Sequence, residues 1–320
     1  MAIIRILPDD VLIEMAPGET LLDTSLRAGI AHAHACAGHA RCSTCRIEVT
    51  DGIDNCAPRT VAEQVLADRL NFAPHLRLAC QTQVHANTTI RRLVLDDDDV
   101  AIVDQRERGA APISAGEERA LAILFADIAG FTAFSEPLPP HDVVHVLNRY
   151  FHAMGRAIAQ FGGCIDNYMG DGLMALFGLP EIALESSDDA MHAVQAGLAM
   201  LTAMDSLKPY LENAYGRSFD VRIGIHYGEA VVGSVGALGR ERVTAIGDAV
   251  NFASRIEGAN KLAGTRLLVS EALYEQINPR LRIGRTVRAV VQGKTGEYTL
   301  NEVVGLIEST QVPPSSSGMN

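Results

Sequence analysis

Two aspartates, Asp127 and Asp171, stand where apolar segments of the chain end. Asp127 follows the apolar run that begins at Ile123, and Asp171 lies in a tight turn after Gly170. If the flanking runs form neighbouring antiparallel strands, both carboxylates meet at one end of a sheet, where a charge needs a partner. Two such hard anions suit a pair of Mg²⁺ or Mn²⁺ ions that also hold phosphates. Two unrelated turn aspartates are the alternative that the spacing leaves open.

A second group of reactive residues consists of cysteines in the spacing Cys36-x5-Cys42-x2-Cys45-x34-Cys80. The N-terminus carries neither a charged leader nor a cleavage site, which predicts a cytoplasmic protein with reduced thiols. The pattern therefore favours metal or cluster ligation over disulfides. Small residues between Cys36 and Cys45 allow the backbone to wrap a compact cofactor and to offer N–H groups to its sulfurs.

A four-cysteine zinc site and a Rieske-type site that uses His39 are the alternatives to a cluster held by four cysteines. Zinc sites of this kind usually show two close cysteine pairs, whereas only Cys42 and Cys45 are closely spaced. Four cysteines already complete a ligand set, so we expect His39 to be solvated. Cys56 and Cys164 have no partner pattern and are interpreted as ordinary thiols.

A third group combines an amide and a guanidinium. Asn251 and Arg255 are four residues apart, and therefore on one face of a predicted helix. An amide can hydrogen-bond a ribose or ring oxygen, and an arginine can hold phosphate oxygens while negative charge moves. Alone, such a pair is typical of a protein surface, but together with the two aspartates it indicates a site.

Composition and charge narrow the class of protein. The 320 residues are enough for two compact domains, and 48% hydrophobic with 21% charged residues is ordinary for a globular protein. No apolar run approaches the length needed to span a bilayer. The net charge of −12 argues against a general binder of nucleic acids or anionic membranes, because their phosphates attract positive surface. It does not exclude a nucleotide that local cations and a metal hold.

The first domain is expected over residues 1–95. We predict a hairpin, a helix, a strand, a second helix and a final strand, at 3–15, 20–29, 45–50, 60–70 and 78–84. Residues 96–119 have the composition of a linker, including the charge run Asp96–Asp99. This linker is either a passive tether or a segment that transmits a signal.

The second domain, at 120–307, alternates helices and strands as α/β folds do. After a strand that leads to Asp127, we predict a helix, a strand hairpin, a second helix, two strands joined at Tyr227-Gly228, a strand that ends near Ile246, a helix and three more strands. Their limits are 140–160, 164–177, 187–204, 220–226, 229–235, 250–262, 267–270, 285–291 and 298–304. The composition of residues 308–320 predicts a disordered tail.

Residues 1–95 resemble the [2Fe-2S] ferredoxins of the adrenodoxin-like branch. The four cysteines and the sequence Arg77-Leu-Ala-Cys80-Gln carry this resemblance. It implies a β-grasp fold with a [2Fe-2S] cluster. It also implies that Cys36 and Cys42 hold one iron, and that Cys45 and Cys80 hold the other.

Four motifs of the second domain resemble the class III nucleotidyl cyclases, over roughly 185 residues and in the family's order. They are Phe125-Ala-Asp127-Ile-Ala-Gly-Phe-Thr, Met169-Gly-Asp171-Gly-Leu-Met-Ala, Arg222-Ile-Gly-Ile-His-Tyr-Gly-Glu and Gly247-Asp-Ala-Val-Asn251-Phe-Ala-Ser-Arg255. The resemblance implies a ferredoxin-like α/β fold that works as a head-to-tail homodimer. Each active site is then built across the interface between subunits.

The resemblance also implies a role for individual residues. Asp127 and Asp171 hold two Mg²⁺ or Mn²⁺ ions, assisted by the carbonyl of Ile128, and Arg222 contacts the triphosphate. Asn251 and Arg255 stabilise the transition state from the other subunit. The implied reaction is in-line attack of the ribose 3′-hydroxyl on the α-phosphorus, with loss of pyrophosphate.

Two regions depart from the family pattern. The purine-selecting lysine is replaced by Asn167, and its partner position holds Thr244. Both side chains can donate and accept hydrogen bonds, so physics leaves the base open. Threonine is typical of the bacterial adenylate-type branch, which favours ATP, with GTP as the alternative. A triphosphate-binding lysine is replaced by Gln292, with Lys294 two residues further on, which predicts weak pyrophosphate binding and modest turnover.

We interpret the chain as an adenylate cyclase whose N-terminal cluster senses redox state, with a redox partner, because cyclisation needs no electrons. The hypothesis is that the cluster changes how residues 96–119 set the two catalytic domains against each other. A rival of another class is an electron-transfer protein whose cyclase-like domain only binds nucleotide. The intact aspartates, asparagine and arginine argue against this rival, whereas Asn167 and Gln292 favour it.

Overall fold

The computed structural model describes residues 2–93, 116–179, 188–236, 242–290 and 296–307. Contacts divide the chain into two compact units, Met1–Glu117 with Gly233–Arg242, and Glu118–Val232 with Val243–Asn320. Most of the predicted linker, the predicted tail at 308–320, and both Gln292 and Lys294 lie outside the described residues. None of the helices within the described ranges has the length and hydrophobicity required to span a bilayer.

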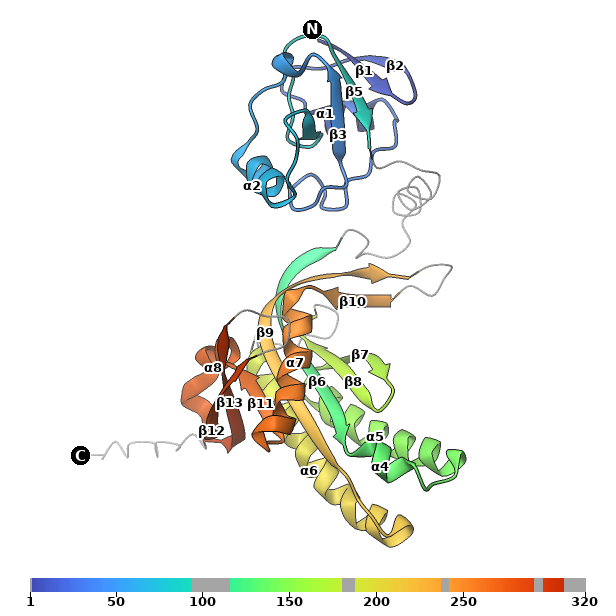
Figure 1. Cartoon of the computed structure of the whole chain (residues 1–320), viewed down its shortest axis with the longest axis vertical. Helices are drawn as coiled ribbons and strands as arrows, with labels where there is room; N and C mark the ends of the chain where they lie inside the picture. The colour runs from blue at the N-terminus through green and yellow to red at the C-terminus, as the bar shows by residue number, and fades with distance from the viewer. Residues whose placement is uncertain (1, 94–115, 180–187, 237–241, 291–295, 308–320) are drawn as a thin grey trace, which may run out of the picture. The chain divides into compact units, whose positions relative to one another are not determined.

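The first unit is a β-grasp domain, as predicted, with strands in the order β2-β1-β5-β3-β4 (Figure 1). β1 and β5 are parallel, and the other neighbours are antiparallel. The side-chain hydroxyls of Thr20 and Thr60 accept hydrogen bonds from the first turns of α1 and α2, so each helix begins at a threonine cap. The elements are β1 (Ile3–Leu7), β2 (Val11–Glu14), α1 (Leu21–Arg27), β3 (Arg46–Asp51), η1 (Ile53–Asn55), α2 (Val61–Arg69), β4 (Leu76–Leu78) and β5 (Thr88–Arg92).

The prediction of a strand over 78–84 is wrong. The strand ends at Leu78, because the backbone beyond it bonds elsewhere: Ala79 O accepts from Leu22 N at 3.0 Å, and Thr82 O accepts from Leu21 N at 2.9 Å. These bonds bend the chain around Cys80. The pairing strand is instead β5, which has a threonine and an arginine among its buried positions and so lacks a clear apolar alternation.

The second unit contains an eight-stranded sheet in the order β12-β13-β11-β9-β6-β8-β7, with β10 paired to β9. The spatial order β9-β6-β8-β7, with α5 and α6 as crossovers, is that of the predicted ferredoxin-like fold. The elements are β6 (Glu117–Ala129), α4 (Phe131–Ser135), α5 (Pro140–Gln160), β7 (Cys164–Met169), β8 (Gly172–Phe177), α6 (Asp189–Tyr215), β9 (Asp220–Val235), β10 (Arg242–Ile246), α7 (Asp248–Ala263), β11 (Leu267–Ser270), α8 (Glu271–Ile277), η2 (Asn278–Arg280), β12 (Leu281–Val290) and β13 (Glu297–Leu306).

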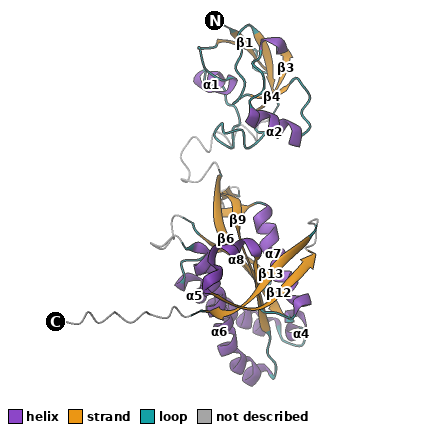
Figure 2. Ribbon diagram, turned by 90° about the vertical axis from the view of Figure 1, so that its left-hand side faces the viewer, coloured by secondary structure: helices purple, strands orange, loops and turns teal. Residues whose placement is uncertain are grey.

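Helices cover both faces of this sheet (Figure 2). On one face, α5 and α6 pack on alternate residues of β6, including Leu124 and Ile128, and form the main core. On the other face, α7 packs through Ala249 and Ala253 against Leu121 and its neighbours. Because side chains of a strand alternate between faces, β6 is apolar almost throughout its central part and is buried on both sides.

The structure corrects three expectations in this unit. The two strands expected to join at Tyr227-Gly228 are one continuous strand, β9. Gly228 serves close packing, since a Cβ there would lie 2.7 Å from His226 Nε2 and 3.2 Å from Ala249 Cβ. Helix α6 continues past its expected end and through Pro209 to Tyr215, held by buried Leu207 and Leu211. β6 begins at Glu117, inside the segment expected to be linker.

Candidate active site and cluster site

The structure brings Asp127 and Asp171 together at one end of the second sheet. β6 pairs with β8 through Ala126 and Leu173, and the turn before β8 carries Asp171. Asp127 Oδ1 lies 3.4 Å from the position that a Cβ on Gly172 would occupy. Burial, and then the charge of Asp127, raise the pKa of Asp171. The two carboxylates are therefore close enough to repel each other, as the ligands of a shared cation do.

Arg222 of β9 lies between two carboxylates. Its Nη2 donates to Asp127 Oδ2 at 3.0 Å. Its Nε lies 3.2 Å from Glu257 Oε1, but without hydrogen-bond geometry. In this state the arginine neutralises Asp127, so its predicted contact with a triphosphate stays a prediction.

Glu257 of α7 is a member of this cluster that the sequence analysis missed. Burial, and then the charge of Asp127, raise its pKa to about 7, although Arg222 opposes the shift. The helix comes this close because β9 has a glycine at its crossing point: a Cβ on Gly224 would lie 2.1 Å from Glu257 N. A signal was present in the sequence, since Glu257 falls four residues after Ala253, on the packed face of the helix.

Tyr150 of α5 lies beneath the same carboxylates. The side chain is fully buried, and within the described part of the chain its hydroxyl has no hydrogen-bond partner. Burial, followed by the charges of Asp127, Asp171 and Glu257, raises the pKa of this phenol. Tyr150 follows the apolar periodicity of an amphipathic helix, so its sequence position indicates only a core residue, and the fold reveals that it lies near the carboxylates.

Asn251 and Arg255 lie on α7 but not in the carboxylate cluster. Asn251 is exposed and Arg255 is half-buried. Neither side chain has a hydrogen bond or ion pair with any of the described residues.

Three further predicted site residues lie on strands around this sheet end. Ile128, next to Asp127, buries its side chain in the main core. Asn167 of β7 pairs with Met174 of β8, and Thr244 is buried in β10. Met174 of β8 and Ala245 of β10 belong to the same buried cluster on the α7 face of the sheet.

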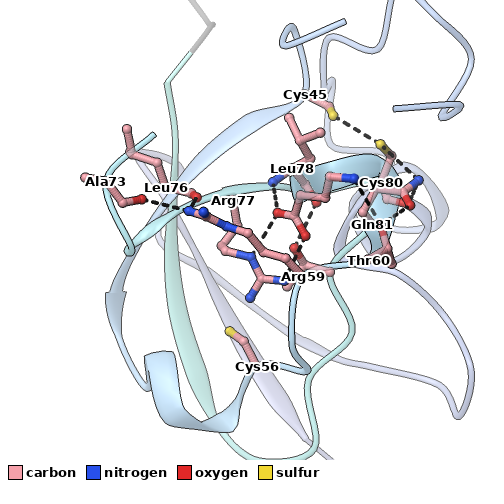
Figure 3. Close-up of polar contacts among 12 residues, drawn as sticks. Cys45, Cys56, Arg59, Thr60, Ala73, Leu76, Arg77, Leu78, Cys80 and Gln81 are labelled. Atoms are coloured by element: carbon pink, nitrogen blue, oxygen red, sulfur yellow. Dashed lines mark hydrogen bonds and ion pairs between the residues drawn. The ribbon is translucent and has the colours of Figure 1, made fainter. Parts of the chain in front are cut away.

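Three of the four predicted cluster cysteines, Cys36, Cys42 and Cys45, lie in the loop before β3, and Cys80 lies just after β4. Cys45 and Cys80 Sγ atoms are 3.4 Å apart (Figure 3), and Cys36 and Cys42 interact with each other. The pKa of Cys80 is lowered by its hydrogen bond from Cys45, with a further contribution from Gln81. The backbone is left-handed at Ala37, Gly38 and Ala40, which gives the loop its curvature.

Among the described residues, no three His, Cys, Asp or Glu side chains are arranged as a single-metal site. Two pairs of cysteines are instead what a two-iron cluster needs, because each iron takes two protein sulfurs. The thiols are all free. The donor set, two pairs of free thiols, therefore fits a [2Fe-2S] group.

A buried ion pair lies next to the segment that carries Cys80. Arg77 Nε and Nη2 donate to the two carboxylate oxygens of Glu63, each at 2.9 Å, and Leu78 N donates to Glu63 Oε1 at 2.8 Å. Both side chains are almost completely buried. The pair fixes α2 to β4, and so fixes the segment that carries Cys80.

Comparison with known proteins agrees with both halves of the structure. Residues 113–302 match the family model of the adenylate and guanylate cyclase catalytic domain, and residues 4–85 match that of the 2Fe-2S iron-sulfur cluster binding domain. Over 201 residues the chain is 39% identical to an adenylate cyclase of Anabaena cylindrica, which covers 60% of this chain and 38% of that protein. An adenylate cyclase 1 of Rhizobium meliloti is matched over only 28% of its length, so the chain spans well under half of these relatives.

Solved structures of both cyclase types are similar to the second unit. The guanylyl cyclase Cya2 matches with a TM-score of 0.56 and 33% identity, covering 61% of this chain and 97% of that one. The adenylyl cyclase CyaB from P. aeruginosa matches with a TM-score of 0.54 and 30% identity, with the same coverage. The chain belongs to the adenylate and guanylate cyclase catalytic domain family, and it carries a 2Fe-2S ferredoxin domain on the N-terminal side of that domain.

Proposed function

We propose that this chain is an adenylate cyclase, which converts ATP to 3′,5′-cyclic AMP and pyrophosphate at two sites of a head-to-tail homodimer. The observation that carries the proposal is the meeting of Asp127, Asp171 and Arg222 at the end of β6 in a chain of this family. The name of the Anabaena relative supports ATP. The likeness to a guanylyl cyclase, with the ambiguous Asn167 and Thr244, makes GTP the second candidate.

Asp127 and Asp171 fit a pair of divalent cations. Burial and then the charge of Asp127 raise the pKa of Asp171, and a bound cation would relieve the repulsion between the two carboxylates. The carbonyl of Ile128 would add a further hard oxygen ligand. Two bound metal ions would supply Lewis acidity at the ribose hydroxyl and at the leaving pyrophosphate. With nucleotide present, Arg222 would turn from Asp127 towards the triphosphate.

The remaining roles belong to residues that the dimer would bring together. Asn251 would orient the ribose and Arg255 would balance charge on the transferred phosphate in the partner's site, since both side chains lack partners within their own described chain. Asn167 and Thr244 would recognise the base, and Lys294 would contact the triphosphate.

The proposed domain limits are 1–95 for the ferredoxin domain, 96–119 for the linker, 120–307 for the catalytic domain and 308–320 for the tail. The strand β6 begins slightly before the proposed catalytic domain, at Glu117.

In the first unit we assign one iron of the cluster to Cys36 and Cys42, and the other to Cys45 and Cys80. The 3.4 Å approach of Cys45 and Cys80 and the lowered pKa of Cys80 support the second pair. The cluster would act as a sensor served by a redox partner, because the proposed reaction transfers no electrons.

An activity assay with ATP and GTP in parallel tests the proposal. The purified chain, with its cluster intact, is incubated with each nucleotide and Mn²⁺ or Mg²⁺, and the products are separated by chromatography. We expect cyclic AMP from ATP. Cyclic GMP alone would reassign the substrate, and no cyclic product from either nucleotide would favour the electron-transfer alternative.

A further inference from the structure

Asp127, Arg222 and Glu257 meet on the α7 face of the second sheet. The strands β6 and β9 are neighbours in this sheet, and α7 crosses β9 at Gly224, two residues after Arg222. The residues on either side of Arg222 and Asp127 belong to the main core on the opposite face: Val221, Ile223, Ala126 and Ile128. Because side chains alternate along a strand, Arg222 and Asp127 both point towards α7, the helix that carries Glu257.

Arg222 stands between two carboxylates but is hydrogen-bonded to only one of them. Its Nη2 donates to Asp127 Oδ2 at 3.0 Å. Its Nε lies 3.2 Å from Glu257 Oε1, yet these two buried atoms have no hydrogen-bond partner among the described residues. The buried pair of the first unit differs, since Arg77 donates to Glu63 through both Nε and Nη2, each at 2.9 Å. A buried donor and a buried acceptor of opposite charge are therefore left unsatisfied beside each other, which is costly.

This geometry gives Arg222 a second partner within reach. Asp127 cannot give Oδ2 to a guanidinium and also use that oxygen fully for a divalent cation, so Arg222 must leave Oδ2 before the proposed metal pair is held. Alignment of Arg222 Nε with Glu257 Oε1 would satisfy both orphaned atoms at once. An arginine presents five N–H donors in a rigid fork, so both Nη groups then become available to phosphate oxygens.

We propose that Glu257 is a positioning residue, which takes over Arg222 from Asp127 and so frees that carboxylate for a divalent cation. Glu257 acts through Arg222 and keeps the guanidinium beside the carboxylates, with its Nη groups directed to the triphosphate. The contact of Arg222 with substrate rests on the proposed function. The exchange of Arg222 between Asp127 and Glu257 does not, because it can be measured with a metal ion alone.

Calorimetric titration with Mn²⁺, on the full chain and without nucleotide, tests the exchange in a double-mutant cycle. The variants are Glu257→Gln, Arg222→Gln and the two combined, at pH 8, where the Glu257 carboxyl, with a pKa of about 7, is mostly charged. We expect Glu257→Gln to weaken Mn²⁺ binding about tenfold, as loss of an outer-shell partner does, because Arg222 then has only Asp127. In the Arg222→Gln background the same change should cost less than about threefold, through lost long-range attraction alone.

Two further variants separate positioning from packing. Glu275→Gln, an exposed change on α8, should leave Mn²⁺ affinity within about twofold. Glu257→Asp keeps a carboxylate and should recover part of the affinity lost in Glu257→Gln. Equal losses with and without Arg222 overturn the proposal, because Glu257 would then act on the cation directly. Unchanged Mn²⁺ affinity in Glu257→Gln overturns it as well.

Kinetics provide an independent readout. In the cyclase assay at saturating Mn²⁺, Glu257→Gln raises the nucleotide KM about fivefold and changes kcat less, because Arg222 is held less firmly for the triphosphate. Glu275→Gln changes neither constant. If the wild type binds Mn²⁺ but forms no cyclic nucleotide, the proposed function fails, and the double-mutant cycle still decides whether Glu257 acts through Arg222.

Discussion

Asp127 connects the three parts of the carboxylate cluster, since it lies beside Asp171, pairs with Arg222 and shifts the pKa of Glu257. Asp127→Asn removes one anionic ligand from the proposed metal pair. We expect cyclase turnover to fall roughly a hundredfold or more, because loss of even an outer-shell partner of a metal costs about 10–100-fold. Mn²⁺ binding, measured by calorimetry, weakens in parallel. Glu275→Gln, an exposed carboxylate-to-amide change on α8, serves as the control. Normal turnover in Asp127→Asn would contradict the metal assignment.

Glu257 is expected to make the stability of the fold depend on pH. Its pKa rises from 4.5 to about 7 on folding, so the neutral carboxyl is favoured in the folded state. This contribution to stability is fully present below about pH 4.5 and is lost as the pH rises through about 7. Glu257→Gln keeps a neutral side chain at every pH. Without divalent metal, it should raise the free energy of unfolding at pH 8 by about 1 kcal/mol, allowing for solvent screening, and change it little at pH 5.

Urea unfolding of both chains at the two pH values provides the measurement for Glu257→Gln. An equal shift at pH 5 and pH 8 would show that packing, and not charge, is responsible. Glu275→Gln again supplies the matched control, because its carboxylate is exposed.

The sequence predicted the two aspartates of the carboxylate cluster better than the residues that pack around them. Asp127 and Asp171 could be placed together from the sequence, because apolar runs on both sides predicted adjacent strands. Glu257 and Tyr150 could not, since their importance comes from packing between α7, β9 and α5 that no local pattern encodes. Arg222 was predicted as a phosphate ligand, but its pairing with Asp127 depends on the distance between β9 and β6, which only the folded sheet sets.

At the scale of elements, the crossing of α7 over β9 decides how the cluster is assembled. A Cβ on Gly224 would lie 2.1 Å from Glu257 N and 2.6 Å from Glu257 Cα, so any side chain there must push the helix away. We expect Gly224→Ala to destabilise the fold by about 1–3 kcal/mol, as overpacked cores do, and to reduce cyclase activity because Glu257 and Arg255 move with the helix. Thermal unfolding and the product assay are the measurements.

Gly258→Ala, on the same helix, is the control for stability. Nothing lies within 4 Å of the Cβ that it would add, so it should leave stability unchanged or raise it by up to about 1 kcal/mol. A similar response of the two variants would show that the crossing at Gly224 is not a constraint.

The elements were predicted well where apolar periodicity was strong. The limits of α5 and of the β7–β8 hairpin agree with the sequence pattern, and both fold classes were correct. Failures occurred where tertiary contacts overrode local signals. Gly228 was interpreted as part of a junction between two strands but serves close packing within β9, and α6, expected to end near 204, continues through Pro209 to Tyr215.

At the scale of the whole molecule, the combination of a ferredoxin domain with a cyclase domain predicts a dependence of activity on the cluster. We expect cyclase rates to differ between the oxidised, the reduced and the cluster-free protein, the last obtained as Cys45→Ser, because the cluster loop loses its shape without iron. Visible absorption verifies the cluster state, and product formation gives the rate. Cys56→Ser, a thiol outside the ligand set, should keep both the absorption and the rate. Equal rates in all cluster states would remove the sensor hypothesis.

Domain order and the presence of two units followed from the sequence, because cysteine spacing and cyclase motifs occupy separate stretches. The junction between the units was predicted less well. The segment 96–119 has loop composition, yet its last residues already belong to β6, where exposed polar residues precede the buried apolar stretch that begins at Leu121.

β6 has a further consequence for signalling. The strand begins at Glu117, inside the predicted linker segment 96–119, carries Asp127 near its other end, and is hydrogen-bonded on both sides. Ten residues of strand correspond to about 33 Å of nearly inextensible backbone. A slip of one residue would turn Asp127 to the opposite face, together with every core side chain of the strand. β6 could therefore slide along its neighbours only in whole-residue steps, and each step would be prohibitively costly. A signal that enters β6 at Glu117 would reach the carboxylates only as a rotation or bending of the whole strand.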